Sequence, residues 1–264
     1  MWYDPTPMVS AGRYAHIYLS PHLDDATLSC GGRIWQQVRA GERVAVFSVF
    51  AGTPEPGVPL SDYAQELHAR WHQPEDAIEW RREEDVQALA VLGAEPVHWR
   101  FLDCVYRRSP DGDFLHTSEE ALSGEIHSSE AGLVKELAGR IALLPLTPGG
   151  TLYVPLGVGR HVDHRIVRQA ADRSGRRLVY FEDFPYAGEQ GALEEALATG
   201  CWGSELVTLS AEALDAKVAA IACYRSQIST FWVDRPAMAI SVREFAAHTG
   251  KGKPAERYWR LTRP

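Results

Sequence analysis

The 264-residue sequence has few cysteines and no long apolar or basic run, and each shortage excludes a class of protein. Its four cysteines are far apart and form no C-x-x-C pair, which is typical of reduced thiols and not of a disulfide framework. No apolar run approaches the roughly 20 residues that span a bilayer. The first residues lack the basic and apolar regions of a signal peptide, so we expect a cytoplasmic location and no membrane span.

Basic residues are also too scattered for a nucleic-acid partner. Lys and Arg total 27 against 35 Asp and Glu, a formal net charge of −8, and no basic stripe follows from their order. Hydrophobic residues make up 45% of the chain and charged residues 23%, the balance of an ordinary globular protein. This length suits one large α/β domain, and we predict a single domain over residues 1–264. The sequence leaves the oligomeric state open, a homo-oligomer included.

Short apolar runs alternate with helical patterns along most of the chain. We predict strands over residues 14–20, 43–50, 97–101, 151–155, 177–181 and 257–262. We predict helices over residues 26–40, 78–92, 129–144, 161–173 and 210–225. Strands that alternate with helices of this length indicate βαβ crossovers. The predicted fold class is therefore α/β, with a mostly parallel sheet flanked by helices and a ligand site outside the carboxyl ends of the strands.

Two long irregular stretches, residues 51–73 and 102–127, each follow a predicted strand. The first is rich in proline, and the second holds the turn sequence Ser-Pro-Asp-Gly-Asp at 109–113. Stretches of this length in a compact domain are usually functional lids or disordered. We expect both to border the site. Asp103, at the start of the second stretch, either lines the mouth of the pocket or lies on the surface.

Two segments at predicted strand ends carry the chemistry. Strand 14–20 runs into Pro-His-Leu-Asp-Asp at 21–25, and strand 151–155 is followed by His-Val-Asp-His at 161–164. Three positions separate His22 from Asp25 across a tight turn. His161 and His164 are i, i+3 neighbours if a helix starts there. Because an open α/β sheet binds ligands at the carboxyl ends of its strands, both segments are candidates for one site.

Two histidines and an aspartate suit a catalytic Zn²⁺, which keeps one position open for water. The expected ligands of one zinc ion per chain are His22, Asp25 and His164. Zinc lowers the pKa of a bound water to around 7, and a carboxylate and an imidazole beside it can move protons. Asp24 is then the general base and His161 the acid. Asp163 is expected to bond His161 and hold its tautomer.

Each motif also has a plainer interpretation, which the sequence leaves open. Asp24 and Asp25 directly before a helix can serve as helix caps. An isolated H-x-x-H pair can be a surface or a core pair. The occurrence of both segments at strand ends favours a metal site, and composition and spacing alone go no further.

The two segments together resemble the P-H-P-D-D and H-P-D-H signatures of the PIG-L/LmbE family of zinc-dependent N-acetylglucosaminyl deacetylases. Similarity extends to an R-x-x-E helix at 81–84, to Glu-Asp-Phe-Pro-Tyr at 182–186 and to a K-x-x-A-x-x-x-[HY]-x-S-Q helix at 217–227. The matches run from Ser20 to Gln227, about four fifths of the chain. As a set, these motifs are specific to the family.

The resemblance implies a Rossmann-like sheet and a small-molecule substrate. The implied reaction is zinc-dependent removal of an N-acetyl group from an N-acetylglucosamine-type sugar or sugar conjugate. The resemblance implies the same zinc ligands, base and acid, and it matches Arg81 to an arginine that contacts the sugar in relatives. Arg81 can instead form an ion pair with Glu84 or Asp85 on its own helix.

Three positions depart from the family pattern. Leu23 replaces a proline and Ala26 a glutamate of P-H-P-D-D-E. Gly159 stands where some sugar-thiol deacetylases carry an oxyanion-binding tyrosine, so that task falls to zinc, His161 and Arg160. Two alternatives remain open: a zinc-dependent amidase for a non-sugar N-acyl substrate, and a catalytically inactive Rossmann-like binding module. Leu23 and Ala26 are the sequence support for the second.

Overall fold

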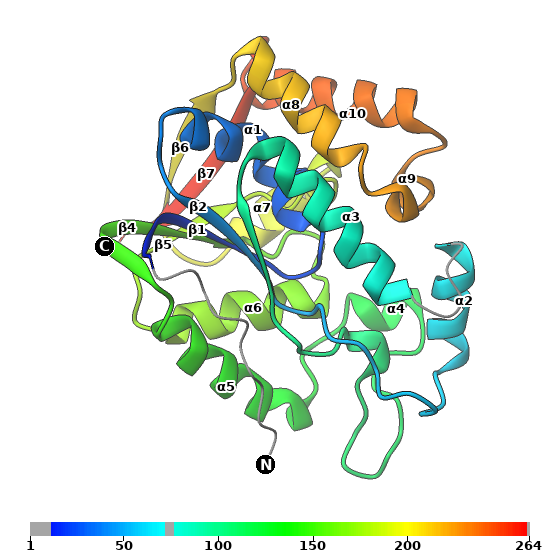
Figure 1. Cartoon of the computed structure of the whole chain (residues 1–264). Helices are drawn as coiled ribbons and strands as arrows, with labels where there is room; N and C mark the ends of the chain where they lie inside the picture. The colour runs from blue at the N-terminus through cyan, green and yellow to red at the C-terminus, as the bar shows by residue number, and fades with distance from the viewer. Residues whose placement is uncertain (1–11, 72–76, 263–264) are drawn as a thin grey trace.

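The strands form one seven-stranded sheet in a computed structural model of the chain, which describes residues 12–71 and 77–262 (Figure 1). Their spatial order is β3-β2-β1-β4-β5-β7-β6. The strands are β1 (Tyr14–Ser20), β2 (Val44–Ser48), β3 (Glu95–His98), β4 (Leu146–Pro155), β5 (Leu178–Phe181), β6 (Trp202–Thr208) and β7 (Ala255–Leu261). Strands β1 to β5 pair in parallel, whereas β7 is antiparallel to both β5 and β6. The predicted α/β class with a mostly parallel sheet is confirmed.

Helices cover both faces of this sheet. The α-helices are α1 (Asp25–Arg39), α2 (Asp62–Arg70), α3 (Ala77–Leu92), α4 (Glu119–Leu122), α5 (Ala131–Ala142), α6 (Val162–Arg173), α7 (Ala192–Leu197), α8 (Ala211–Ile221), α9 (Arg225–Phe231) and α10 (Arg235–Thr249). Short 3₁₀ turns are η1 (Cys104–Tyr106), η2 (Ser128–Glu130) and η3 (Tyr186–Gly188). Figure 1 shows α5 and α6 below the sheet and α1, α3 and α8 above it.

The central strands are buried on both faces, as parallel strands between two helical layers must be. All five residues of β2 are buried, and so are the last four of β1. Tyr18 of β1 stacks on Tyr153 of β4 with ring centroids 4.2 Å apart. This packing fixes β1 against β4, the two strands from whose ends the candidate motifs emerge.

Several element boundaries differ from the sequence prediction. Strand β3 covers Glu95–His98 and not residues 97–101, because its ladder with β2 ends where β2 ends, at the pair Ser48 and His98. Strand β4 begins at Leu146 instead of residue 151, because its first residues pair with β1 across a register shift. Helix α5 is shorter than the predicted helix 129–144, and η2 takes the place of its first turn.

Strand β6 and helix α10 are not among the elements predicted from the sequence. Strand β6 lies at the sheet edge and is mostly exposed, so it lacks the apolar run that identifies a buried strand. Helix α10 does carry a readable signal: Asp234 caps it, and Met238, Val242 and Ala246 are buried at four-residue spacing. Within the described residues, no helix is long and apolar enough to cross a membrane. The single-domain organisation stays a prediction.

The strand order places a crevice between β1 and β4. From β1 the chain proceeds outward through β2 and β3, and it returns to the other side of β1 at β4. The chain leaves the carboxyl ends of two such strands toward helices on opposite faces of the sheet. In open α/β sheets, ligands bind in the crevice between them. Helix α1 follows β1 and α6 follows β4, so both candidate motifs lie at this crevice.

Candidate active site

The turn between β1 and α1 presents His22, Asp24 and Asp25. The Ser20 hydroxyl accepts the Ala26 backbone N–H at 2.9 Å and so satisfies a first-turn amide of α1. Asp24 occupies the cap position but makes no side-chain capping hydrogen bond to any described residue. Asp25 Oδ2 accepts the backbone N–H of His22 at 2.7 Å and folds back over the turn. The interpretation of Asp24 as a side-chain helix cap is therefore wrong, and no capping hydrogen bond from a described residue engages its carboxylate.

His161 caps α6 with its ring. Its Nδ1 accepts the Asp163 backbone N–H at 3.3 Å. Because a backbone amide can only donate, the proton of the neutral ring lies on Nε2. Burial, together with the charges of His22 and His164, holds the pKa of His161 well below its usual value. His161 is thus a neutral imidazole that presents an N–H donor.

Three donor atoms converge between the two turns. Asp25 Oδ2 lies 3.2 Å from His22 Nδ1 and 3.3 Å from His164 Nε2. Ligands at about 2.0–2.1 Å around a tetrahedral ion are separated by about 3.3 Å. His164 Nε2 is buried and makes no hydrogen bond within residues 12–71 and 77–262, although Asp25 Oδ2 lies 3.3 Å away. Two imidazole nitrogens and a carboxylate oxygen at this spacing fit a zinc ion.

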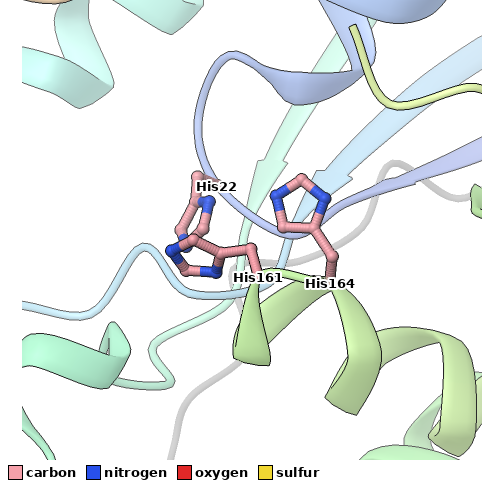
Figure 2. Close-up of side chains that lie close together, drawn as sticks. All are labelled: His22, His161 and His164. Atoms are coloured by element: carbon pink, nitrogen blue, oxygen red, sulfur yellow. The ribbon is translucent and has the colours of Figure 1, made fainter. Parts of the chain in front are cut away.

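Figure 2 shows how the three imidazoles of the site lie. His22 comes from the loop after β1, and His161 and His164 come from the start of α6. One ring nitrogen of each lies within 4.8 Å of the others. The structure thus brings His22 close to His161 and His164, which follow it by 139 and 142 residues in the sequence.

A carboxylate lies against one ring nitrogen of His22 and another against one ring nitrogen of His164. Asp163 Oδ2 lies 3.1 Å from His22 Nε2, and Asp183 Oδ1 lies 2.7 Å from His164 Nδ1. Asp183 Oδ2 is itself held by the backbone N–H groups of residues 157 and 158. Such partners fix the tautomer and orientation of metal-binding imidazoles. Asp183 lies in the segment 182–186 that resembles the family, but its contact with His164 was not predicted from the sequence.

The Asp163 carboxylate contacts a different histidine from the one expected. It faces His22, and it also accepts the Cys104 backbone N–H at 3.0 Å and lies 2.6 Å from Arg107 Nη2. Positions i and i+2 of a helix point to different faces, so a side chain at 163 turns away from His161. The Arg107 guanidinium lowers the pKa of Asp163 although burial opposes this. The expected bond from the Asp163 carboxylate to His161 is therefore wrong, because this carboxylate bonds His22 instead.

Asp24 is buried in the wall of the site. Burial and the neighbouring Asp25 charge raise its pKa to about 6, against the opposing charges of Arg81 and His22. Arg81 Nη2 lies 3.8 Å from Asp24 Oδ1. The guanidinium of Arg81 also lies over the Trp71 ring, 4.7 Å from its centroid. A carboxylate with this pKa can exchange a proton near neutral pH.

The alternative partners of Arg81 on its own helix are occupied elsewhere. Glu84 accepts hydrogen bonds from the hydroxyl and the backbone N–H of Ser226. Asp85 accepts a hydrogen bond from the Tyr224 hydroxyl at 2.7 Å. The interpretation of Arg81 as a partner of Glu84 or Asp85 is wrong, because its side chain turns toward Asp24.

A cavity of about 340 Å³ opens over these groups. His22, Asp24, Asp25, Arg81 and His161 all line it. The stretch 51–73 contributes Tyr63 and Trp71 to the wall, and the stretch 102–127 contributes Asp103 and Glu119. Asp103 Oδ2 lies 3.7 Å from His22 Nε2, so this side chain lies at the cavity wall and not on the outer surface.

The positions that depart from the family pattern are accommodated by packing. Leu23 and Ala26 are both buried, with 2% and 1% of their surface exposed. Arg160, a candidate for the oxyanion, forms ion pairs at 3.1 Å with two glutamates, Glu125 and Glu195. It lines a neighbouring cavity and not the one over His161. The structure therefore does not bring Arg160 into the site.

Comparison with known proteins agrees with this geometry. The profile of the GlcNAc-PI de-N-acetylase family, PIG-L, matches residues 17–174. A 2′-N-acetylparomamine deacetylase of Niallia circulans is 27% identical over 189 residues, which are 65% of this chain and 67% of the relative. A protein of the same description from Streptomyces fradiae is 28% identical over 185 residues, which are 67% of this chain and 60% of the relative.

A solved structure extends the similarity over nearly the whole chain. The zinc-inhibited form of a teicoplanin deacetylase superposes with a TM-score of 0.79 and 29% identity. The alignment covers 94% of this chain and 98% of that one. The likeness therefore includes β6, β7 and the helices beyond residue 174, which the family profile does not reach.

Proposed function

The chain belongs to the GlcNAc-PI de-N-acetylase (PIG-L) family, and from that premise we propose a zinc-dependent hydrolase of N-acetylated sugars. It removes an N-acetyl group from an N-acetylglucosamine-type sugar or sugar conjugate and releases acetate and the amine. The observation that carries the proposal is the convergence of His22 Nδ1 and His164 Nε2 on Asp25 Oδ2, at 3.2 and 3.3 Å, at a site where the buried His164 Nε2 makes no hydrogen bond to any described residue. The relatives named for 2′-N-acetylparomamine and teicoplanin support an amino-sugar conjugate as substrate.

His22, Asp25 and His164 would hold the zinc ion. When bound there, zinc supplies a Lewis acid and makes water a nucleophile near neutral pH. Asp163 and Asp183 keep the two imidazoles in the orientation that exposes His22 Nδ1 and His164 Nε2 to one point. Because these carboxylates bond the opposite ring nitrogens, the donor atoms stay directed at that point when the site is empty.

Asp24 serves as the general base. Its carboxylate lines the cavity, makes no capping bond and has a pKa near 6, so it is ionised at neutral pH yet basic enough to take a proton from the attacking water. The proton can then pass to the leaving nitrogen as the carbon–nitrogen bond breaks. Arg81, 3.8 Å away, holds the base in its ionised form before the reaction.

His161 stabilises the charge that develops on the acetyl oxygen. Its Nδ1 is occupied by the start of α6, so the neutral ring can offer only its Nε2–H to the substrate. A fixed donor of this kind acts on charge as it appears and needs no rearrangement. The neutral state of His161 makes it a hydrogen-bond donor in this step and leaves acid catalysis to the proton on Asp24.

Arg81 and Asp103 are the proposed substrate contacts. Both line the cavity, Arg81 from α3 and Asp103 from the start of η1. A guanidinium over the Trp71 ring and a carboxylate at the cavity wall suit the hydroxyl groups of a sugar. Their positions predict that a sugar ring lies between α3 and η1, with its acetamide over His22.

A substrate panel tests this proposal. The protein, loaded with one equivalent of zinc, is incubated with 2′-N-acetylparomamine, N-acetylglucosamine and N-acetyllysine, and released acetate and amine are measured. Zinc in excess is avoided, because a structural relative is known in a zinc-inhibited form. We expect release from at least one sugar and a loss of about 100-fold or more in Asp24→Asn. Release from N-acetyllysine alone would instead support the non-sugar amidase, and release from none the inactive binding module.

A further inference from the structure

Tyr186 is a cavity residue to which no role has been given. It opens η3, directly after the segment that carries Asp183. It lines the same cavity as His22, Asp24 and His161. Its ring meets His164 edge to face, with centroids 6.0 Å apart, and meets Phe231 in the same manner at 6.4 Å. The ring is therefore held between the candidate metal centre and α9.

The position of Tyr186 explains why residue 159 is glycine. Gly159 has a left-handed backbone with φ of +80°, which other residues rarely adopt. A Cβ at this position would lie 2.6 Å from Cγ and 2.7 Å from Cβ of Tyr186. The Tyr186 ring thus fills the space that a side chain at 159 would need. A tyrosine at 159, the family variation absent from this sequence, is excluded by the tyrosine at 186.

The Tyr186 hydroxyl is available to a ligand. It has no hydrogen-bond partner in the part of the chain that the structure describes. A phenol with no protein partner at the wall of a reaction cavity can donate its hydrogen to a substrate oxygen.

We propose that Tyr186 donates a hydrogen bond to the acetyl carbonyl oxygen as that oxygen gains negative charge. The phenol keeps its proton throughout, and no bond to it forms or breaks. His161 approaches the same oxygen from α6, so the site offers two donors from different elements. The inference rests on the proposed deacetylase function and names a catalytic residue for it. The effect belongs to the transition state, because the carbonyl of the bound substrate is a weaker acceptor than the oxyanion.

The first test is kinetic. Tyr186→Phe keeps the ring that packs on Gly159 and His164 and removes only the hydroxyl. We expect kcat for the panel sugar that is turned over to fall about 10- to 100-fold, with KM within about twofold of the parent. Tyr180→Phe is the matched control, because the Tyr180 hydroxyl bonds Asp172 at 2.6 Å and lines no part of this cavity. Its kcat should stay within about twofold.

The second test measures binding without turnover. The probes are the N-methylphosphonyl analogue of glucosamine, whose tetrahedral anionic group imitates the transition state, and glucosamine itself, the product. By calorimetry, Tyr186→Phe should bind the analogue about tenfold more weakly and the product equally well. Zinc content and unfolding temperature, measured alongside, should match the parent.

The outcomes separate the two proposals. An active parent with an impaired Tyr186→Phe and a selective loss of analogue binding supports the assignment. An active parent with an unimpaired Tyr186→Phe overturns the role of Tyr186 and leaves the deacetylase function standing. Equal weakening of analogue and product also overturns it, because that result describes a general binding contact. A parent inactive on both sugars overturns the deacetylase function, and the role of Tyr186 with it.

Discussion

Single residues in this site divide into those that are tied down and those that are left free. His22 and His164 each have one ring nitrogen bonded to a carboxylate, and the opposite nitrogens converge on Asp25. Among the described residues Asp24 makes no capping bond, and Arg81 Nη2 lies 3.8 Å from its Oδ1. The two histidines expected to bind metal are thus each oriented by a carboxylate, whereas the residue expected to move a proton has no capping bond to the described part of the chain.

The buried carboxylate of Asp24 lowers the stability of the metal-free fold at neutral pH. Burial and the Asp25 charge raise its pKa from 3.8 to about 6, so the unfolded chain loses this proton at a lower pH than the folded chain does. Stability is therefore lost as pH rises from about 4 to 6, and the loss stays constant above. We expect metal-free Asp24→Asn to be more stable than the parent by about 2–3 kcal/mol at pH 7.5 and by little at pH 4. Urea unfolding at both pH values measures this, and an Asp24→Asn no more stable at pH 7.5 would contradict it.

Local sequence predicted the site residues better than their partners. The positions of His22, Asp25, His161 and His164 at predicted strand ends were enough to predict that they lie close together. The partner predicted for Asp163 was wrong, because the imidazole of His161 lies on another face at the start of the helix. The contact of Asp183 with His164 was not predicted, because Asp183 follows β5, the strand next to β4 in the sheet. Contacts between separate strand ends are not visible in the order of residues.

At the scale of elements, the predictions held where burial is complete. Strands β1, β2 and β5 and helices α1, α3, α5 and α6 agree with the predicted bounds within one or two residues, because apolar runs and helical periodicity are strong signals. Strand β6 was missed because an exposed edge strand resembles a loop in composition. The register of β3 depends on where β2 ends, a property of the pair that neither segment shows alone.

Helix α8 is tied to the sheet by a buried ion pair. Lys217 Nζ lies 2.8 Å from Glu256 Oε1 and 3.1 Å from the Ser29 carbonyl oxygen, which joins α8 to β7 and α1. Lys217 and Glu256 are only 3% and 4% exposed. The lysine of the K-x-x-A motif is therefore a structural residue that positions the helices behind the site.

Removal of one partner should be costly, because it leaves a buried charge without its counter-ion. We expect Lys217→Met to destabilise the fold by about 3 kcal/mol. The control is Arg243→Met, which breaks the exposed pair of Arg243 with Asp215 and should cost about 0.5 kcal/mol or less. Urea denaturation of the three proteins gives both values. A Lys217→Met as stable as Arg243→Met would show that the pair does not hold α8 in place.

At the scale of the whole molecule, the strand order decides where the chemistry lies. The order in which successive strands join the sheet reverses between β1 and β4, and described residues of the stretches 51–71 and 102–127 line the cavity there. Residues 72 and 73 of the first predicted stretch lie outside the described residues. The helices that begin at this cavity, α1 and α6, bring the ligands from opposite faces of the sheet. The architecture thus brings the proposed zinc ligands together from two turns, neither of which carries all three of them.

We propose that this crevice binds one zinc ion, and the number of zinc ions per chain is the direct measure of such binding. Burial opposes protonation of His164, but Asp25 and Asp183 raise its pKa to about 10, so zinc must displace a proton and binds more tightly as pH rises toward 10. The protein is therefore equilibrated with zinc at pH 8, desalted and analysed for zinc per chain. The variants are His164→Ala and, as control, the exposed His127→Ala.

We predict about one zinc per chain in the parent and in His127→Ala, and little in His164→Ala with its circular dichroism unchanged. Asp183→Asn should retain the ion with an affinity about 10- to 100-fold lower. A parent that retains no zinc, or a His164→Ala that retains as much as the parent, would contradict the account.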